Sequence, residues 1–274
     1  MPNFFSALAY PYLQNALAGG LIVAVLAAFV GYFVVLRGAA FATHALSQIG
    51  FAGAAGAVLI GAEPVLGLIL FSLLGAAGLG ALSLRSRADD AGTALLLVAS
   101  LGTGALFLGL ASGFSSNVVA LLFGTIVGVD RAQVALTAGA AACALALLAA
   151  VGRPLLFATI ARDAARAAGV PVVALDFAFL GIVALAAAVT VPIVGTLLVF
   201  SLTLGPAAAA LQVTTRPALA FPLAIAFGGA AVGAGTALAY ETDWPVGFFI
   251  AAIALGEYLA ARAYASRGRA SRTA

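Results

Sequence analysis

Long apolar stretches, separated by short polar breaks, run along the whole chain. Residues 16–36 are apolar on every face of a helix, whereas outer-membrane strands alternate apolar and polar residues. A helix needs about 20 apolar residues to cross a bilayer. The pattern therefore predicts an all-α integral membrane protein, a polytopic bundle of eight or nine transmembrane helices. The predicted segments are residues 15–36, 41–61, 64–84, 92–111, 132–151, 173–191, 194–213, 218–239 and 245–264.

Two breaks in this pattern affect the helix count. The break at Val191-Pro192 separates two segments, but a single bent crossing there would give eight helices instead of nine. Residues 112–128 are too short and too polar for another full span. We expect a short helix or a re-entrant piece on the outer side, because irregular backbone at membrane depth needs cover from protein or water.

Composition supports a membrane protein without a soluble domain. Of the 274 residues, 65% are hydrophobic and 8% are charged, against roughly 25% charged in a typical soluble domain. Too few polar residues exist to cover a soluble core of this size. We expect residues 1–274 to form a single transmembrane domain, and Cys143 excludes a disulfide framework because it is the only cysteine.

The arginines predict the topology. All twelve basic residues are arginine, and loops on the cytoplasmic side are enriched in Lys and Arg. If the first segment ends inside at Arg37, every arginine except Arg131 falls on the cytoplasmic side. This predicts an outside amino terminus, a cytoplasmic carboxyl terminus, a long cytoplasmic loop at 153–171 and a short, frayed basic tail at 265–274.

Four polar residues gather near the start of the second segment. His44, the only histidine, is followed at i+4 by Gln48, and Thr43 and Ser47 form a second i,i+4 pair beside them. Such residues usually face the bundle interior or a water-filled path. One interpretation is hydrogen bonding between helices. The other is a pore lining in which His44 is a transient metal ligand, since imidazole binds Zn, Cu, Fe and Ni.

Two acids lie within or next to the apolar segments. We expect Asp176, at the start of the sixth segment, to lie at the membrane interface. Glu257 lies deeper, and we expect it to pair with an arginine at a cytoplasmic helix end because an unpaired carboxylate there is costly. A place for Glu257 in an ion path is the alternative.

The chain contains no nucleotide-binding motif. Residues 102–109 are rich in glycine but lack the Gly-Lys-[Ser/Thr] ending that reaches phosphates. We therefore expect no enzymatic activity, and any ATP chemistry must come from a partner. The Ala-rich run at 159–170 predicts a short amphipathic cytoplasmic helix that stops at Gly169, before Pro171. It could lie on the membrane surface or dock into a soluble partner.

Over nearly its whole length the chain resembles the permease subunits of ABC-type zinc/manganese/iron importers. Four stretches in order carry this resemblance, and they are residues 31–41, 119–124, 163–170 and 194–210, the last with Pro206. The resemblance implies the ABC importer permease fold, a homodimer around a central path, and import of divalent metal ions into the cytoplasm. It also implies cytoplasmic ATPase subunits that engage a coupling helix, whose candidate contact residues here are Arg162, Asp163, Arg166 and Gly169.

The same resemblance implies an extracytoplasmic metal-binding protein as a partner, the cell membrane of a prokaryote as the location, surrounding lipid, and no nucleic acid. Metal ligands would come from His44 and Gln48, flanked in the translocation path by Thr43 and Ser47. The family usually has Asp and His at the positions of His44 and Gln48. This difference from the family leaves open which metal is carried. It also leaves open the alternative that the substrate is a metal chelate or another small solute. An ion-coupled secondary transporter is the third alternative.

Overall fold

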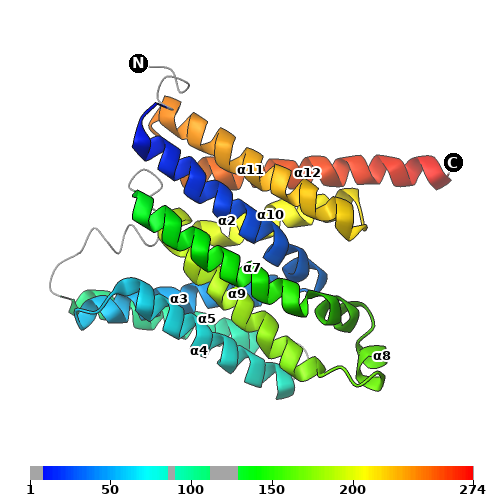
Figure 1. Ribbon diagram of the computed structural model, residues 1–274, viewed down its shortest axis with the longest axis horizontal. Helices are drawn as coiled ribbons and strands as arrows, with labels where there is room; N and C mark the ends of the chain where they lie inside the picture. Colours follow the sequence, from blue (N-terminus) through cyan, green and yellow to red (C-terminus); the bar gives the residue numbers. More distant parts are fainter. Residues whose placement is uncertain (1–8, 86–89, 112–128, 274) are drawn as a thin grey trace.

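The computed structural model describes residues 9–85, 90–111 and 129–273, and within these ranges the ordered elements are all α-helices (Figure 1). This confirms the predicted all-α class. The piece predicted at 112–128, including the stretch 119–124, lies outside the described residues. The helices are α2 (Pro11–Leu36), α3 (Ala40–Leu59), α4 (Pro64–Arg85), α5 (Asp90–Leu110), α7 (Arg131–Ile160), α8 (Arg162–Ala167), α9 (Val172–Val194), α10 (Thr196–Val213), α11 (Pro217–Thr242) and α12 (Val246–Thr273).

Every predicted apolar segment corresponds to one long helix. In the part of the chain that the structure describes, seven helices are long and apolar enough to cross a membrane by length and composition. The remaining two predicted segments are α3, whose 20 residues include the polar run, and α10, whose apolar part is shorter. The segmentation read from the sequence is therefore confirmed within the described ranges.

The break between α9 and α10 lies at Gly195 rather than at Val191-Pro192. Helix α9 continues through Pro192 and ends at Val194, and Gly195 then adopts a φ of 86°. Glycine tolerates this positive φ because it has no Cβ. The two segments are thus separate helices and not one bent crossing.

Two helices extend beyond their predicted ends. Helix α7 continues past residue 151, through Pro154, to Ile160, so much of the predicted loop at 153–171 is helix. Helix α12 continues to Thr273, where a frayed tail was predicted from residue 265. The α12 extension is rich in Arg, a strong helix former. The α7 extension instead buries Leu155 and Ala158 in the main core cluster.

Close helix packing surrounds the candidate site. The helices α2, α3, α7 and α9 share one buried apolar cluster. Gly53 of α3 and Gly67 of α4 lie backbone to backbone, and Gly31 of α2 lies against the Thr203 carbonyl of α10. Gly50 and Gly53 face α4 while Gly56 meets Phe107 of α5, and small residues at such positions let membrane helices approach closely.

Candidate functional site

The polar run lies at the start of α3, directly after a tight turn from α2. Gly38, with a φ of 65°, follows Arg37, and the Gly38 and Ala39 amides donate to Val35 and Val34 carbonyls. This pattern is a Schellman motif. It lets α3 begin at Ala40 and brings the polar run close to the end of α2.

The structure brings all four predicted polar residues into the protein interior. Thr43, Ser47 and Gln48 are buried, and His44 is half-buried. The Thr43 hydroxyl donates to the Ala39 carbonyl at 2.9 Å, and the Ser47 hydroxyl donates to the His44 carbonyl at 2.8 Å. These two hydroxyls are therefore satisfied within their own helix.

His44 and Gln48 differ from their neighbours because each has a buried polar atom without a hydrogen-bond partner. These atoms are His44 Nδ1 and Gln48 Oε1. Burying a polar atom without a partner costs about 1–3 kcal/mol. Most buried polar atoms in proteins are hydrogen-bonded, so such exceptions require an explanation. A metal ion in transit would give both atoms a partner.

A third unpartnered polar atom lies on α10, opposite α3. The His44 ring meets the Phe200 ring edge-on, with centroids 5.2 Å apart. Helices α3 and α10 pack against each other. On α10, Thr196 precedes Phe200 by four residues, which is about one helical turn.

Thr196 is fully buried, and its Oγ1 has no hydrogen-bond partner. The residue stands at the first position of α10, directly after Gly195. Reasoning from sequence missed it as a site residue, because a single threonine in an apolar segment normally bonds its own helix. The signal that could have found it is the preceding glycine, since a helix start leaves no carbonyl one turn earlier for the hydroxyl.

The described part of one protomer does not provide a complete metal site. No group of three or more His, Cys, Asp and Glu side chains gathers within residues 9–85, 90–111 and 129–273. The candidate ligands are therefore one imidazole nitrogen, one amide oxygen and one hydroxyl, which makes the arrangement suitable for weak, transient binding.

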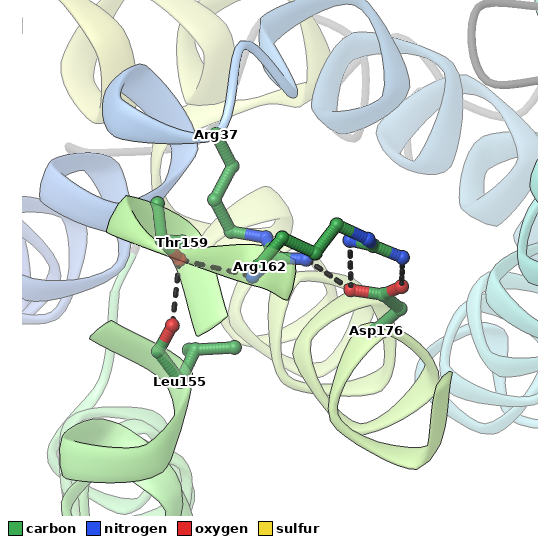
Figure 2. Close-up of polar contacts among 5 residues, drawn as sticks. All are labelled: Arg37, Leu155, Thr159, Arg162 and Asp176. Atoms are coloured by element: carbon green, nitrogen blue, oxygen red, sulfur yellow. Dashed lines mark hydrogen bonds and ion pairs between the residues drawn. The ribbon is translucent and has the colours of Figure 1, made fainter. Parts of the chain in front are cut away.

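A second cluster of polar residues joins α2, α7, α8 and α9 at the opposite end of α9 (Figure 2). Arg37 pairs with Asp176, and its other nitrogen donates to the Thr159 hydroxyl at 3.0 Å. Arg162 donates to both Asp176 oxygens, at 2.6 and 3.3 Å. We call Arg37, Thr159, Arg162 and Asp176 the ionic junction. The Arg37 guanidinium also lies over the Phe179 ring, 4.9 Å from its centroid, a favourable cation–π contact.

The ionic junction connects α8 to the membrane helices. Ala165 is fully buried in the main core cluster, whereas Asp163 and Arg166 are exposed. Gly169, with a φ of 78°, ends the helix in a second Schellman motif, which confirms the predicted stop. Of the four predicted coupling residues, Arg162 therefore points inward to Asp176, and Asp163, Arg166 and Gly169 are exposed.

Within the described residues, Asp176 has ionic partners that were not predicted, and Glu257 lacks the partner that was predicted. Asp176 was expected only at an interface, and it is the shared acceptor of two arginines. Glu257 was expected to pair with an arginine, but it forms no ion pair within the described residues, and its Oε2 is buried without a hydrogen-bond partner. The nearby arginines of α12 follow at Arg262 and Arg267, one turn or more beyond it.

Comparison with known proteins identifies similar chains. The model of the ABC 3 transport family matches residues 9–265. The manganese transport system membrane protein MntC of Halalkalibacterium halodurans is 30% identical over 192 residues, which cover 69% of this chain and 66% of MntC. The manganese import system permease protein ScaB of Streptococcus parasanguinis is 27% identical, over 60% of this chain and 58% of ScaB. The alignments with these curated relatives thus span less than two thirds of their length.

A solved structure matches over a longer range. PsaBC from Streptococcus pneumoniae, in complex with Fab, superimposes with a TM-score of 0.84 at 26% identity, and the match covers 94% of each chain. The helical bundle described above is therefore similar to that structure over nearly its whole length.

Proposed function

The chain belongs to the ABC 3 transport family, and from this membership we propose that it is the membrane-spanning permease of an ATP-driven importer of divalent transition-metal ions. In this proposal residues 1–274 act as one permease domain in a bacterial plasma membrane. The chain itself hydrolyses no ATP. A cytoplasmic ATPase supplies the energy, and an extracytoplasmic binding protein delivers the metal.

The observation that carries the proposal is the pair of unpartnered atoms His44 Nδ1 and Gln48 Oε1. Both lie on one face of α3, and the His44 ring contacts Phe200 of α10, about one turn after Thr196, whose Oγ1 is also unpartnered. We assign these three atoms to the metal path, with Thr43 and Ser47 completing the polar face of α3. An ion that passes through must leave again, so incomplete ligation by weak ligands suits transport better than a closed metal site would.

The ligand chemistry supports manganese as the preferred cargo. Amide and hydroxyl oxygens are hard ligands, and oxygen ligands suit Mn²⁺. A single imidazole is also compatible with Zn²⁺ or Fe²⁺. MntC and ScaB are named as manganese proteins, which favours the same metal. The absence of a family-like carboxylate at His44 predicts weak binding, because no negative charge at that position offsets the charge of the ion.

A second copy of the chain would complete the ligand set. One protomer offers a single imidazole, and two His44 residues meeting across a homodimer would offer two nitrogen ligands. Because coordination by two copies requires a central path between them, the proposal includes a homodimer in which α3 lies near that path.

The ionic junction gives a route for mechanical coupling. The exposed Asp163 and Arg166 of α8 would contact the ATPase, while Arg162 holds α8 to Asp176 on α9. Helix α9 then runs without a break to Gly195, which directly precedes Thr196. Movement of α8 would thus shift α9 and the glycine hinge beside the path, and bias the equilibrium between inward-open and outward-open states. In this arrangement the ionic junction is cytoplasmic, the amino terminus is outside and the carboxyl terminus is inside.

The test is uptake by the full complex in proteoliposomes. We expect ATP-dependent accumulation of Mn²⁺, with Zn²⁺ and Fe²⁺ as weaker competitors. Uptake that proceeds without ATP would contradict the ABC mechanism. Uptake of a metal chelate in preference to every free ion would replace the proposed cargo but leave the ATP-driven mechanism intact.

A further inference from the structure

An apolar groove runs along α2 between α7 and α11. Figure 1 shows α7 and α11 on either side of α2, and α2 packs against both. The groove has a volume of about 410 Å³, within the range of small-molecule pockets. Its floor is Phe29, Tyr32 and Phe33 of α2, and Phe221 of α11 closes one side.

The groove is lined by apolar side chains with one charge at its edge. The Phe29 and Phe221 rings stack with centroids 4.7 Å apart, and Tyr32 meets Phe221 at 4.5 Å. Among the described residues that line the groove, Arg153 of α7 is the only charged one. Its side chain is exposed, and it forms no ion pair with any described residue. A groove this apolar with a free cation at one end fits an amphipathic anion.

The position of the groove matches one leaflet of a bilayer. Phe29 precedes Arg37 of the ionic junction by eight residues, which is about 12 Å along a helix. Half of a hydrocarbon core is about 15 Å thick. Pro217, the first residue of α11, also lines the groove, and the exposed Arg216 precedes it. The groove therefore occupies the leaflet on the arginine-rich side, and its cationic end lies near that membrane surface.

We propose that this groove binds one acyl chain of an anionic phospholipid from the cytoplasmic leaflet, with the headgroup phosphate held by Arg153 and Arg216. Guanidinium groups bind phosphate through charge-assisted, often bidentate hydrogen bonds. Basic pockets between membrane helices on the cytoplasmic side are suited to anionic headgroups.

The occupant is testable with a tryptophan placed in the groove. The chain has one tryptophan, Trp244, which lies on the short turn between α11 and α12 and is not part of the groove lining. In the full chain, Trp244→Phe with Phe221→Trp moves the only tryptophan into the groove. Vesicles that contain brominated phosphatidylglycerol or brominated phosphatidylcholine then report contact between an acyl chain and this tryptophan by fluorescence quenching.

We expect brominated phosphatidylglycerol to reach half-maximal quenching at about a fivefold lower mole fraction than brominated phosphatidylcholine. Arg153→Gln should remove this preference, whereas Arg262→Gln, which changes an exposed arginine of α12 outside the groove, should leave it unchanged. Equal quenching by both lipids in the parent chain would overturn the proposal, as would equal loss in both arginine variants. Absence of quenching by either lipid would show that protein, such as a second copy of the chain, covers the groove.

A second measurement avoids the substitution at Phe221. The unaltered full chain, purified from a membrane that contains both lipid classes, should retain phosphatidylglycerol in native mass spectrometry. The Arg153→Gln chain should retain about fivefold less. Equal retention by the two chains would contradict the assignment of Arg153 to the headgroup.

Discussion

Arg37, the residue that ends α2, donates a hydrogen bond to Asp176, in the second turn of α9, although 139 residues separate them in sequence. Arg162 of α8 donates to the same carboxylate. Asp176 is thus the only acid in the ionic junction, and it holds two arginines that would otherwise repel each other. This relationship links the segment proposed to contact the ATPase with two helices of the membrane bundle.

Substitution of Asp176 should uncouple ATP hydrolysis from transport. Asp176→Asn removes the charge and leaves the Arg37 and Arg162 guanidinium groups close together, with a cost of about 2 kcal/mol. We expect ATPase activity of the complex to persist while metal uptake per ATP hydrolysed falls severalfold. Asp176→Glu should restore part of the coupling, because it restores the carboxylate.

The matched control for this prediction is Asp243→Asn. Asp243 is exposed and has a φ of 57°, a left-handed conformation that asparagine also tolerates. Coupling should be unchanged in this variant. If Asp176→Asn transported as efficiently as Asp243→Asn, the ionic junction would have no role in coupling.

Much of the fold was predictable because a membrane helix can be recognised in a sequence by the length of its apolar stretch. All nine predicted segments correspond to helices, and Gly169 ends α8 as predicted. Helix ends outside the apolar stretches were not predictable in the same way. The extension of α12 to Thr273 depends on the helix propensity of Arg-rich sequence, which hydropathy does not measure. The extension of α7 to Ile160 goes with the packing of Leu155 and Ala158 in the core, which depends on the tertiary structure.

Only the residues that α3 contributes to the candidate site could be predicted from the sequence. His44 and Gln48 could be proposed from spacing along one helix, since i,i+4 residues share a face. Thr196 could not, because its burial without a hydrogen-bond partner depends on the turn at Gly195 and on how the surrounding helices pack. The ionic junction was missed for the same reason, as Arg37 and Asp176 come together only through tertiary contacts between helices distant in sequence.

His44 should be required for transport but not for assembly. His44→Ala removes the only imidazole of the proposed path, so we expect metal uptake to fall by about tenfold or more. The loss should appear in transport assays with the complete complex. Size-exclusion chromatography should show the same oligomer as for the unaltered protein. Unchanged uptake would remove His44 from the metal path.

Thr196 should contribute to transport at a cost in stability. Thr196→Val replaces a buried, unpartnered hydroxyl with a methyl group of similar shape. We expect the variant to be about 1 kcal/mol more stable, because no hydrogen bond is lost, and to transport metal severalfold more slowly. Thermal unfolding in detergent and metal uptake measure these two effects separately.

A threonine with a satisfied hydroxyl provides the comparison. Thr236 of α11 is buried, and its hydroxyl donates to the Val232 carbonyl at 2.7 Å. Thr236→Val loses that hydrogen bond, so it should be less stable and should transport normally. If Thr196→Val and Thr236→Val changed stability and uptake in the same direction, the unpartnered hydroxyl of Thr196 would have no special role.

Close packing between α3 and α4 should tolerate no added atom at Gly53. A Cβ at this position would collide with the Gly67 carbonyl and the Phe71 side chain, and overpacking of this kind costs about 1–3 kcal/mol. Gly53→Ala should therefore lower the thermal unfolding midpoint and disturb the polar face that α3 carries.

Gly78→Ala on α4 is the matched control, because nothing lies within 4 Å of its added Cβ. Alanine in a helix is favoured over glycine by about 0.5–1 kcal/mol, so the control should unfold at the same or a higher temperature. Equal midpoints for the two variants would show that the backbone contact between Gly53 and Gly67 does not hold α3 in place.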